Sequence, residues 1–172
     1  DLGGTSGIGL IDDDIVDWVW VELRDANDNT AVIESRSALL QRDGDVVDAD
    51  GVSAITFISP AANYYLMIAH RNHIGILSAN TISLSGTITA IDFSADSALV
   101  TGGTNGIADM GDGSFALFSG DFSGDGQIKN TDKIAVEPLR GLSGYNNADI
   151  DMNGEVQNTD VNNALNPNIG RG

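Results

Sequence analysis

A pattern of twelve residues, rich in aspartate and glycine, occurs twice in the last third of this 172-residue chain. The first copy runs from Asp121 to Asp132, and the second copy runs from Asp149 to Asp160. Both copies fit D-x-[SD]-x-[DN]-G-x-[IV]-x-x-x-D, so six positions carry the same constraint in the same order. Two unrelated surface turns would not share all six positions. The repeat therefore constrains the fold of this region more than any other feature of the sequence.

Each constrained position has a role in a calcium loop of the EF-hand type, in which oxygen atoms surround a hard cation. Side-chain oxygens come from positions 1, 3, 5 and 12, and position 7 contributes its backbone carbonyl. Position 6 needs a sharp turn that suits glycine. The predicted ligands of the first calcium ion are Asp121, Ser123, Asp125, the carbonyl of Gln127, and Asp132. The predicted ligands of the second ion are Asp149, Asp151, Asn153, the carbonyl of Glu155, and Asp160.

Position 8 of the two loops is apolar, with Ile128 in the first copy and Val156 in the second. We expect both side chains to point inward and to pair the two loops through a short β bridge. A short helix ended by a proline is expected after each loop, over residues 131–136 and 159–165. No helix is expected before either loop.

This arrangement resembles the calcium-loop repeat of dockerins, in which a helix follows each loop and the preceding helix is missing. Aspartate at position 12, where an EF-hand usually has glutamate, belongs to the same resemblance. Dockerins that bind cohesins present longer recognition helices than the segment from Lys133 to Arg140, which a proline interrupts. The resemblance therefore implies the calcium sites and a small dockerin-like subdomain of loops and helices, but it does not imply a cohesin partner.

The chain before residue 121 has the alternating pattern of short β-strands. Every second residue of the segment 17–24 is apolar, which places three side chains on one face: Val19, Val21 and Leu23. Trp18 and Trp20 fall on the opposite face. Further strands are expected over residues 31–40, 52–59, 63–70, 74–77, 81–84 and 87–93. Many short strands separated by turns are typical of a β-sandwich, so we predict a mostly β fold with an Ig-like or Cna-B-like sandwich.

Four parts of the chain are predicted from these patterns. Residues 1–14 form a flexible or strand-donating segment, and residues 15–99 form the sandwich. Residues 100–120 are a connector that packs on the tail, and residues 121–172 are the calcium-binding tail.

The charge of the chain is strongly one-sided, with 25 acidic against 8 basic residues and a net charge of −17. Such a surface repels the phosphates of nucleic acids and anionic lipids, so neither is expected as a partner. The longest apolar runs are of strand length, which is too short for membrane insertion. Aspartate outnumbers glutamate by 21 to 4, which is typical of turns and oxygen-ligand loops and favours an extracellular location.

Three other clusters carry weaker signals. The acidic runs 12–14 and 43–50 could bind further calcium, but solvated turns and a hairpin are the favoured interpretations. His70 and His73 lie on opposite strand faces or around a bend, and a structural role is favoured over a metal or catalytic pair. Cysteine is absent, and no nucleophile elbow or carboxylate pair in an apolar setting is present, so no enzyme activity is expected.

Segments 16–24, 36–45 and 64–73 resemble a module near the C-termini of large secreted bacterial surface proteins. These are described as adhesin-like or hemagglutinin-like and are frequent in Bacteroidetes-type genomes. The resemblance implies a secreted, calcium-binding, non-catalytic module. The first part of the chain also broadly resembles prealbumin-like and Cna-B domains. Residues 1–120 contain no lysine, so the Lys–Asn crosslink of Cna-B domains cannot form within this part.

We therefore expect a calcium-stabilised structural or adhesive module of a bacterial cell-surface or secreted protein. Its expected partners are copies of itself, in one version as the subunit of an extracellular fibre, or neighbouring modules of a larger surface protein. One alternative is a dockerin-like module that anchors a larger secreted enzyme. Another is a carbohydrate-binding module, for which Trp18 and Trp20 would provide a stacking surface. Burial of the two tryptophans against a neighbouring module or the tail is the competing interpretation.

Overall fold

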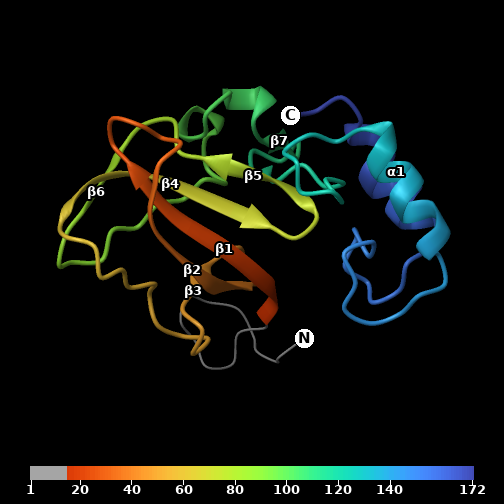
Figure 1. The fold of residues 1–172 in the computed structure, drawn as a ribbon, viewed down its shortest axis with the longest axis horizontal. Helices are drawn as coiled ribbons and strands as arrows, with labels where there is room; N and C mark the ends of the chain where they lie inside the picture. The colour runs from red at the N-terminus through yellow and green to blue at the C-terminus, as the bar shows by residue number, and fades with distance from the viewer. Residues whose placement is uncertain (1–14) are drawn as a thin grey trace.

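The computed structural model describes residues 15–172. The predictions for residues 1–14 therefore lie outside the described residues: a flexible or strand-donating segment, and a solvated acidic turn at Asp12–Asp14 with a further calcium site as the less favoured alternative. Figure 1 shows an antiparallel sheet on one side of the molecule and the loops and short helices of the tail on the other.

One six-stranded antiparallel sheet forms the larger part of the structure. Its strands are β1 (Ile15–Asp25), β2 (Val32–Gln41), β3 (Val46–Val47), β4 (Ala62–His70), β5 (His73–Leu77) and β6 (Ile82–Leu84). The order across the sheet is β3-β2-β1-β4-β5, and β6 pairs with the first residues of β4. The long strand β1 is central because it pairs with β2 on one side and with β4 on the other.

Strand β1 has the two faces that its alternation predicts. Val19, Val21 and Leu23 are buried, whereas Trp18 and Trp20 are 47% and 43% exposed. The buried face packs with apolar residues from neighbouring strands and from the loop after β3. These residues are Ala38, Leu40, Val46, Ile55, Phe57, Leu66 and Ile68.

The strands predicted over 52–59 and 87–93 are wrong, because the first segment makes only one isolated bridge, at Ala54, and the second makes none. The segment 52–59 is held beside β2 by side chains instead of a backbone ladder. Glu34 accepts hydrogen bonds from the N–H groups of Ile58 and Ser59, at 3.0 and 2.8 Å. The alternating apolar residues of this segment therefore reflect the packing of every second side chain on the sheet, and not the pairing of a strand.

Two further strands, β7 (Ala108–Asp109) and β8 (Phe115–Ala116), form a separate two-stranded ladder. Within residues 15–172 no second sheet comparable in size to the first is present. The mainly-β prediction is confirmed, and the two-sheet sandwich stays a prediction.

A short helical segment follows each of the two predicted calcium loops, as expected. After the first loop come the helix α1 (Asn130–Val136) and the 3-10 turn η3 (Glu137–Leu139). After the second loop come the π-helical segment η4 (Asp160–Leu165) and the 3-10 turn η5 (Asn166–Asn168). The remaining 3-10 turns are η1 (Ser97–Leu99) and η2 (Gly103–Asn105). Across residues 15–172 there is no helix of the length and apolar character that a membrane span requires.

The tail is built around one apolar cluster that includes a residue of the sheet. Ile74 of β5 and Phe118 pack with buried side chains from both loops and both helical segments. These side chains are Ile128, Val136, Ala148, Ile150, Val156, Val161 and Leu165. The end of the β4–β5 hairpin is therefore part of the tail's own core.

Candidate metal centre

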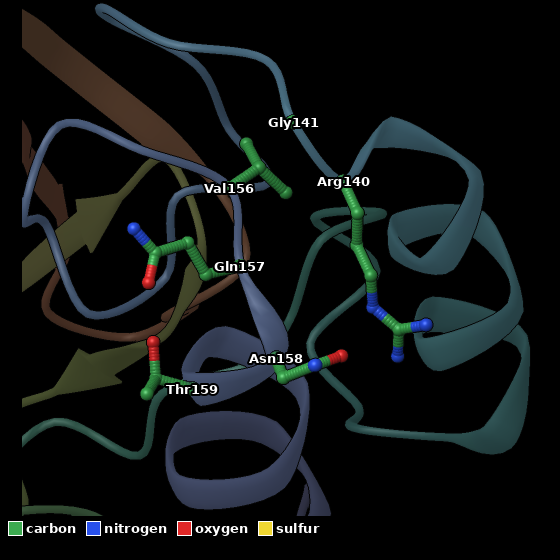
Figure 2. A pocket seen from close by; sticks show the side chains of 6 residues that line it. All are labelled: Arg140, Gly141, Val156, Gln157, Asn158 and Thr159. Atoms are coloured by element: carbon green, nitrogen blue, oxygen red, sulfur yellow. The ribbon is translucent and has the colours of Figure 1, made fainter.

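The two loops are not paired with each other, so the predicted β bridge between Ile128 and Val156 is wrong. Both side chains are fully buried, as expected. The N–H of Val156 donates to the carbonyl of Leu142 at 2.8 Å, and the carbonyl of Val156 accepts from Gly141 N–H at 2.8 Å. The second loop therefore pairs with the segment that follows the first helix. Figure 2 shows Val156 beside Gly141, with the end of η3 and the start of the second helical segment close by.

The first loop makes the matching exchange with the end of the chain. The N–H of Ile128 donates to the carbonyl of Arg171 at 2.9 Å, and the carbonyl of Ile128 accepts from Gly170 N–H at 2.8 Å. Gly141 and Gly170 both have left-handed backbones, with φ of 91° and 96°. This conformation suits glycine and turns the chain back after each helix. Each loop is thus held by the segment that leaves the other loop's helix.

In the second loop, three carboxylates converge. Asp149, Asp151 and Asp160 each offer one oxygen atom, and these atoms all lie within 4.8 Å of one another. Asp149 and Asp160 are buried, and Asp151 is exposed. These three are the predicted acidic ligands of the second calcium ion. Carboxylate oxygens at this spacing suit a hard divalent cation such as calcium.

Backbone N–H groups fix the two buried carboxylates of this loop. Asp160 Oδ1 accepts from Asp151 N–H at 3.0 Å, and Asp160 Oδ2 accepts from Gln157 N–H at 2.7 Å. Asp149 accepts from the N–H groups of Asn153 and Gly154, at 3.0 and 2.9 Å. Burial, together with the carboxylates of Asp160 and Asp151, raises the pKa of Asp149 against the effect of these N–H donors. A divalent cation among the three acids would reverse that repulsion.

The first loop has the same frame of N–H donors. Asp121 Oδ1 accepts from Asp125 N–H at 3.1 Å, and Asp121 Oδ2 accepts from Gly126 N–H at 2.8 Å. Asp132 accepts from the N–H groups of Ser123 and Lys129, at 2.9 and 2.8 Å. Positions 1 and 12 are therefore oriented by equivalent amides in both loops. The Ser123 hydroxyl donates to Asp121 Oδ1 at 3.4 Å.

Position 5 of the first loop departs from this symmetry. The Asp125 carboxylate forms an ion pair with Lys129, whose Nζ lies 2.6 Å from Oδ2. The Lys129 ammonium lowers the pKa of Asp125. Both side chains are exposed, so water screens this ion pair and a cation can displace it. Within residues 15–172, three acids converge only in the second loop.

The ends of both loops carry buried acids. The exposed fractions of Asp121, Asp132, Asp149 and Asp160 are 2%, 1%, 3% and 0%. In the part of the chain that the structure describes, neither lysine nor arginine forms an ion pair with these four carboxylates. Burying an ionised carboxylate is costly unless a cation or hydrogen bonds compensate for its lost hydration. The amides supply part of that compensation, and a bound divalent cation would supply the rest.

The remaining predicted ligands occupy positions that suit the roles given to them. The side chains of Asp125 and Asn153, at position 5, accept from the N–H groups of Gln127 and Glu155, both at 3.0 Å. Gln127 and Glu155 are exposed at position 7, where only the backbone carbonyl is assigned to the metal. Position 6 of both loops has the expected left-handed backbone, with φ of 80° and 92°.

Position 4 is a feature that the motif does not specify. Gly124 and Met152 both have positive φ, at 71° and 57°. Met152 is the one non-glycine residue of the described chain in this conformation. Glycine at position 4 of the first copy was a signal of this requirement, but methionine at the same place in the second copy concealed it.

Asp17, a residue of β1, connects the sheet to the tail. Its Oδ2 accepts from Arg71 Nε at 2.8 Å, and its Oδ1 accepts from the Tyr145 hydroxyl at 2.8 Å. Burial opposes ionisation of Asp17, but the nearby His70 imidazole and the hydrogen bonds from Arg71 and Tyr145 outweigh it and lower the pKa. The sequence signal for this role was an aspartate in phase with the buried Val19 and Val21.

His70 and His73 lie around the bend of the β4–β5 hairpin, which was one of the two predicted arrangements. Their Nδ1 atoms are 2.9 Å apart, and His70 Nε2 lies 3.0 Å from Asp17 Oδ2. Burial, followed by the neighbouring His70 and Arg71, lowers the pKa of His73 to about 3. A neutral, half-buried imidazole bonded within the hairpin favours the structural interpretation.

The acidic run 43–50 is held by hydrogen bonds that suit the hairpin interpretation. Asp48 accepts two hydrogen bonds from Arg36 Nη2, both at 2.8 Å. Asp50 accepts from the N–H and the hydroxyl of Ser53, at 2.8 and 2.5 Å. The Ser53 hydroxyl is the main cause that lowers the pKa of Asp50 to about 2.

The pocket of Figure 2 contains no carboxylate. Its lining residues are Arg140, Gly141, Val156, Gln157, Asn158 and Thr159. It is therefore separate from the acidic side chains of the two loops.

Comparison of the chain with protein-family models, with curated proteins and with solved structures finds no match.

Proposed function

We propose that the chain binds two calcium ions, one in each loop, and serves as a calcium-stabilised extracellular structural or adhesive module of a bacterial cell-surface or secreted protein. The observation that carries the proposal is the pair of buried carboxylates at the ends of each loop, without a basic ion-pair partner in residues 15–172. Oxygen-only donors in a twelve-residue loop with glycine at position 6 are the ligands that calcium prefers.

The two loop-and-helix units support a dockerin-like interpretation of the tail. The helix α1 has 7 residues and ends at Val136, which leaves little surface for partner recognition. We therefore favour a structural role for the tail over cohesin-type anchoring. Anchoring of a larger secreted enzyme is the alternative role for a dockerin-like tail.

Charge supports an extracellular setting for the proposed sites. Two calcium ions would change the formal charge from −17 to −13 and reduce self-repulsion. Extracellular calcium modules bind with dissociation constants of about 10⁻⁴ to 10⁻³ M, well matched to a calcium-rich medium. The partners we propose are copies of this chain or neighbouring modules of a larger surface protein.

Calorimetric titration of calcium into chelator-stripped protein tests the proposal. The expected result is about two sites per chain, with both lost in the double variant Asp132→Asn, Asp160→Asn. A variant of an exposed acid outside the loops, Asp112→Asn, serves as the control and should bind as the unmodified chain does. The absence of calcium binding at neutral pH would refute the proposal.

A second candidate function, carbohydrate binding, is favoured by the exposed tryptophans of β1. The indole N–H of Trp20 donates to Glu22 Oε1 at 3.0 Å, and Glu22 Oε2 accepts from Arg24 Nε at 2.8 Å. These bonds fix the Trp20 ring while its side chain stays 43% exposed. Binding of neutral polysaccharides to the unmodified chain and to the double variant Trp18→Ala, Trp20→Ala tests this role. Equal retention of both proteins would exclude it.

A further inference from the structure

The side chain of Asn72 joins the sheet to the second calcium loop. Asn72 lies in the turn between β4 and β5, and it is fully buried. Its Nδ2 donates to the carbonyls of Asn147 and Asp149, both at 3.0 Å. Because Asp149 occupies position 1 of the loop, the hairpin contacts the residue that opens the proposed site.

Asn72 is itself held firmly in place. Its Oδ1 lies 2.8 Å from His73 Nδ1, and its backbone carbonyl accepts from Gly120 N–H at 2.9 Å. Both polar atoms of the side chain are therefore engaged. A substitution would remove the side-chain bonds to the second loop and leave the backbone bond beside the first loop intact.

The neighbouring Arg71 holds the same stretch of chain. It donates to the carbonyl of Asn146, and its guanidinium carbon lies 4.5 Å from the centre of the Tyr145 ring. Arg71 Nε also donates to the buried Asp17 of β1 at 2.8 Å. The residues that precede the second loop are thus fixed from the sheet by two consecutive residues of one hairpin turn.

We propose that Asn72 is a positioning residue for the second calcium site. Its amide fixes the carbonyls of Asn147 and Asp149, and so fixes the direction in which the Asp149 carboxylate enters the loop. The inference rests on the calcium binding proposed above. Without Nδ2, the carbonyl of the buried Asp149 and the carbonyl of Asn147 would lose this donor, and the loop would have to be ordered by the cation itself.

Linkage makes the effect reciprocal. If the hairpin favours the calcium-binding form of the second loop, calcium in that loop must stabilise the hairpin by the same factor. The N–H of Ile74, which donates to the carbonyl of Phe118 at 2.9 Å, reports on the hairpin. Its hydrogen exchange should slow more when the second loop is filled than when only the first loop is filled.

The experiment isolates each loop in the full-length chain. Asp121→Ala leaves only the second site, and Asp149→Ala leaves only the first. Asn72→Ala is then added to each, and calcium is titrated calorimetrically. Loss of a buried hydrogen-bond donor predicts an increase of about tenfold in the dissociation constant of the second site. The first site should change by less than about twofold, which is within the error of additivity between separate sites.

Asn168→Ala is the matched control. Its Nδ2 donates to the carbonyls of Ser119 and Ala164, at 2.9 and 3.0 Å, and makes no hydrogen bond to residues 149–159 of the second loop. This variant should leave the second site unchanged. Asn72→Asp retains the shape and Oδ1 but lacks the donor, so it should weaken the second site even if Asn72→Ala folds poorly.

Each outcome has a definite meaning. If the unmodified chain binds no calcium, the proposed function fails and this inference fails with it. If both sites bind calcium but neither Asn72 variant weakens the second site, only the role of Asn72 is wrong. Equal weakening of both sites by both variants would show a general loss of structure and would also overturn the positioning role.

Discussion

At the residue scale, the chain places acids where burial is costly and surrounds them with specific donors. Asp17 is buried in β1 among basic and hydroxyl donors, whereas Asp149 and Asp160 are buried with amide donors alone. The donors around Asp17 compensate for its buried charge without a cation. The amides around Asp149 and Asp160 compensate for theirs only in part. This difference separates a structural carboxylate from candidate metal ligands that carry the same functional group.

Substitution of Asp17 should destabilise the whole sheet. Asp17→Ala leaves the mostly buried Arg71 side chain, which is 11% exposed, without its carboxylate partner, and breaking a pair with a buried acid costs up to about 3–5 kcal/mol. Urea unfolding monitored by circular dichroism measures the change. The exposed-pair variant Glu137→Ala, which breaks the contact with Arg140, should cost less than about 1 kcal/mol. Equal effects of the two substitutions would contradict the role given to Asp17.

His73 should make stability depend on pH. Because the folded pKa of about 3 lies below the usual value of 6.5, the unfolded chain binds one more proton between these values. Stability therefore falls as pH decreases from 6.5 towards 3, by up to about 1.4 kcal/mol per pH unit. The free energy of unfolding, measured with chelator present, should fall less steeply between pH 6.5 and pH 4 for His73→Gln than for the unmodified chain. Identical slopes would contradict a His73 that stays neutral in the folded protein.

The left-handed backbone at position 4 offers a stabilising substitution. Met152 occupies a conformation that costs a side chain with a Cβ about 1 kcal/mol and that asparagine tolerates better. Met152→Asn should raise the free energy of unfolding by about 0.5–1 kcal/mol. Gly124→Ala, at the same position of the first loop, should lower it by about 1 kcal/mol. A loss of stability in Met152→Asn would show that other contacts of Met152 outweigh the backbone term.

At the element scale, the loops depend on segments that are distant in sequence. The motif specified the candidate ligands, the glycine turn and the following helices, because these are local properties of twelve to twenty residues. It could not specify that Ile128 pairs with Arg171 or that Val156 pairs with Leu142, because pairing depends on where each helix returns the chain. The same limit explains the wrong strand at 52–59, where Glu34 replaces the backbone ladder with side-chain bonds. The sequence did not indicate a role for Asn72, because only the folded hairpin brings its side chain to the second loop.

Removal of the last three residues should weaken the first calcium site selectively. A chain that ends at Ile169 lacks both backbone hydrogen bonds that Gly170 and Arg171 exchange with Ile128. Their loss should raise the dissociation constant of the first site by about tenfold. The second site, which pairs with Gly141 and Leu142, should be unaffected. Removal of Gly172 alone is the control, and a loss of the second site instead of the first would contradict the exchanged pairing.

At the scale of the whole molecule, the sheet and the tail share one apolar cluster, because Ile74 of β5 packs with residues of both loops. Calcium bound in the tail should therefore stabilise the sheet as well. At a calcium concentration of about 100 times the dissociation constant, each site adds about 2.7 kcal/mol to the stability of the folded form. Calcium should shift thermal unfolding measured by fluorescence of Trp18 and Trp20 as much as unfolding measured by circular dichroism. A shift in only one of the two signals would show that the parts unfold independently.

Native mass spectrometry of calcium-saturated protein tests the central claim most directly, because it counts the ions on each chain. We predict two calcium ions on the unmodified chain, one on Asp121→Ala, one on Asp149→Ala, and none on the double variant. The same number of ions on the unmodified chain and on the double variant would contradict the assignment of calcium to the two loops.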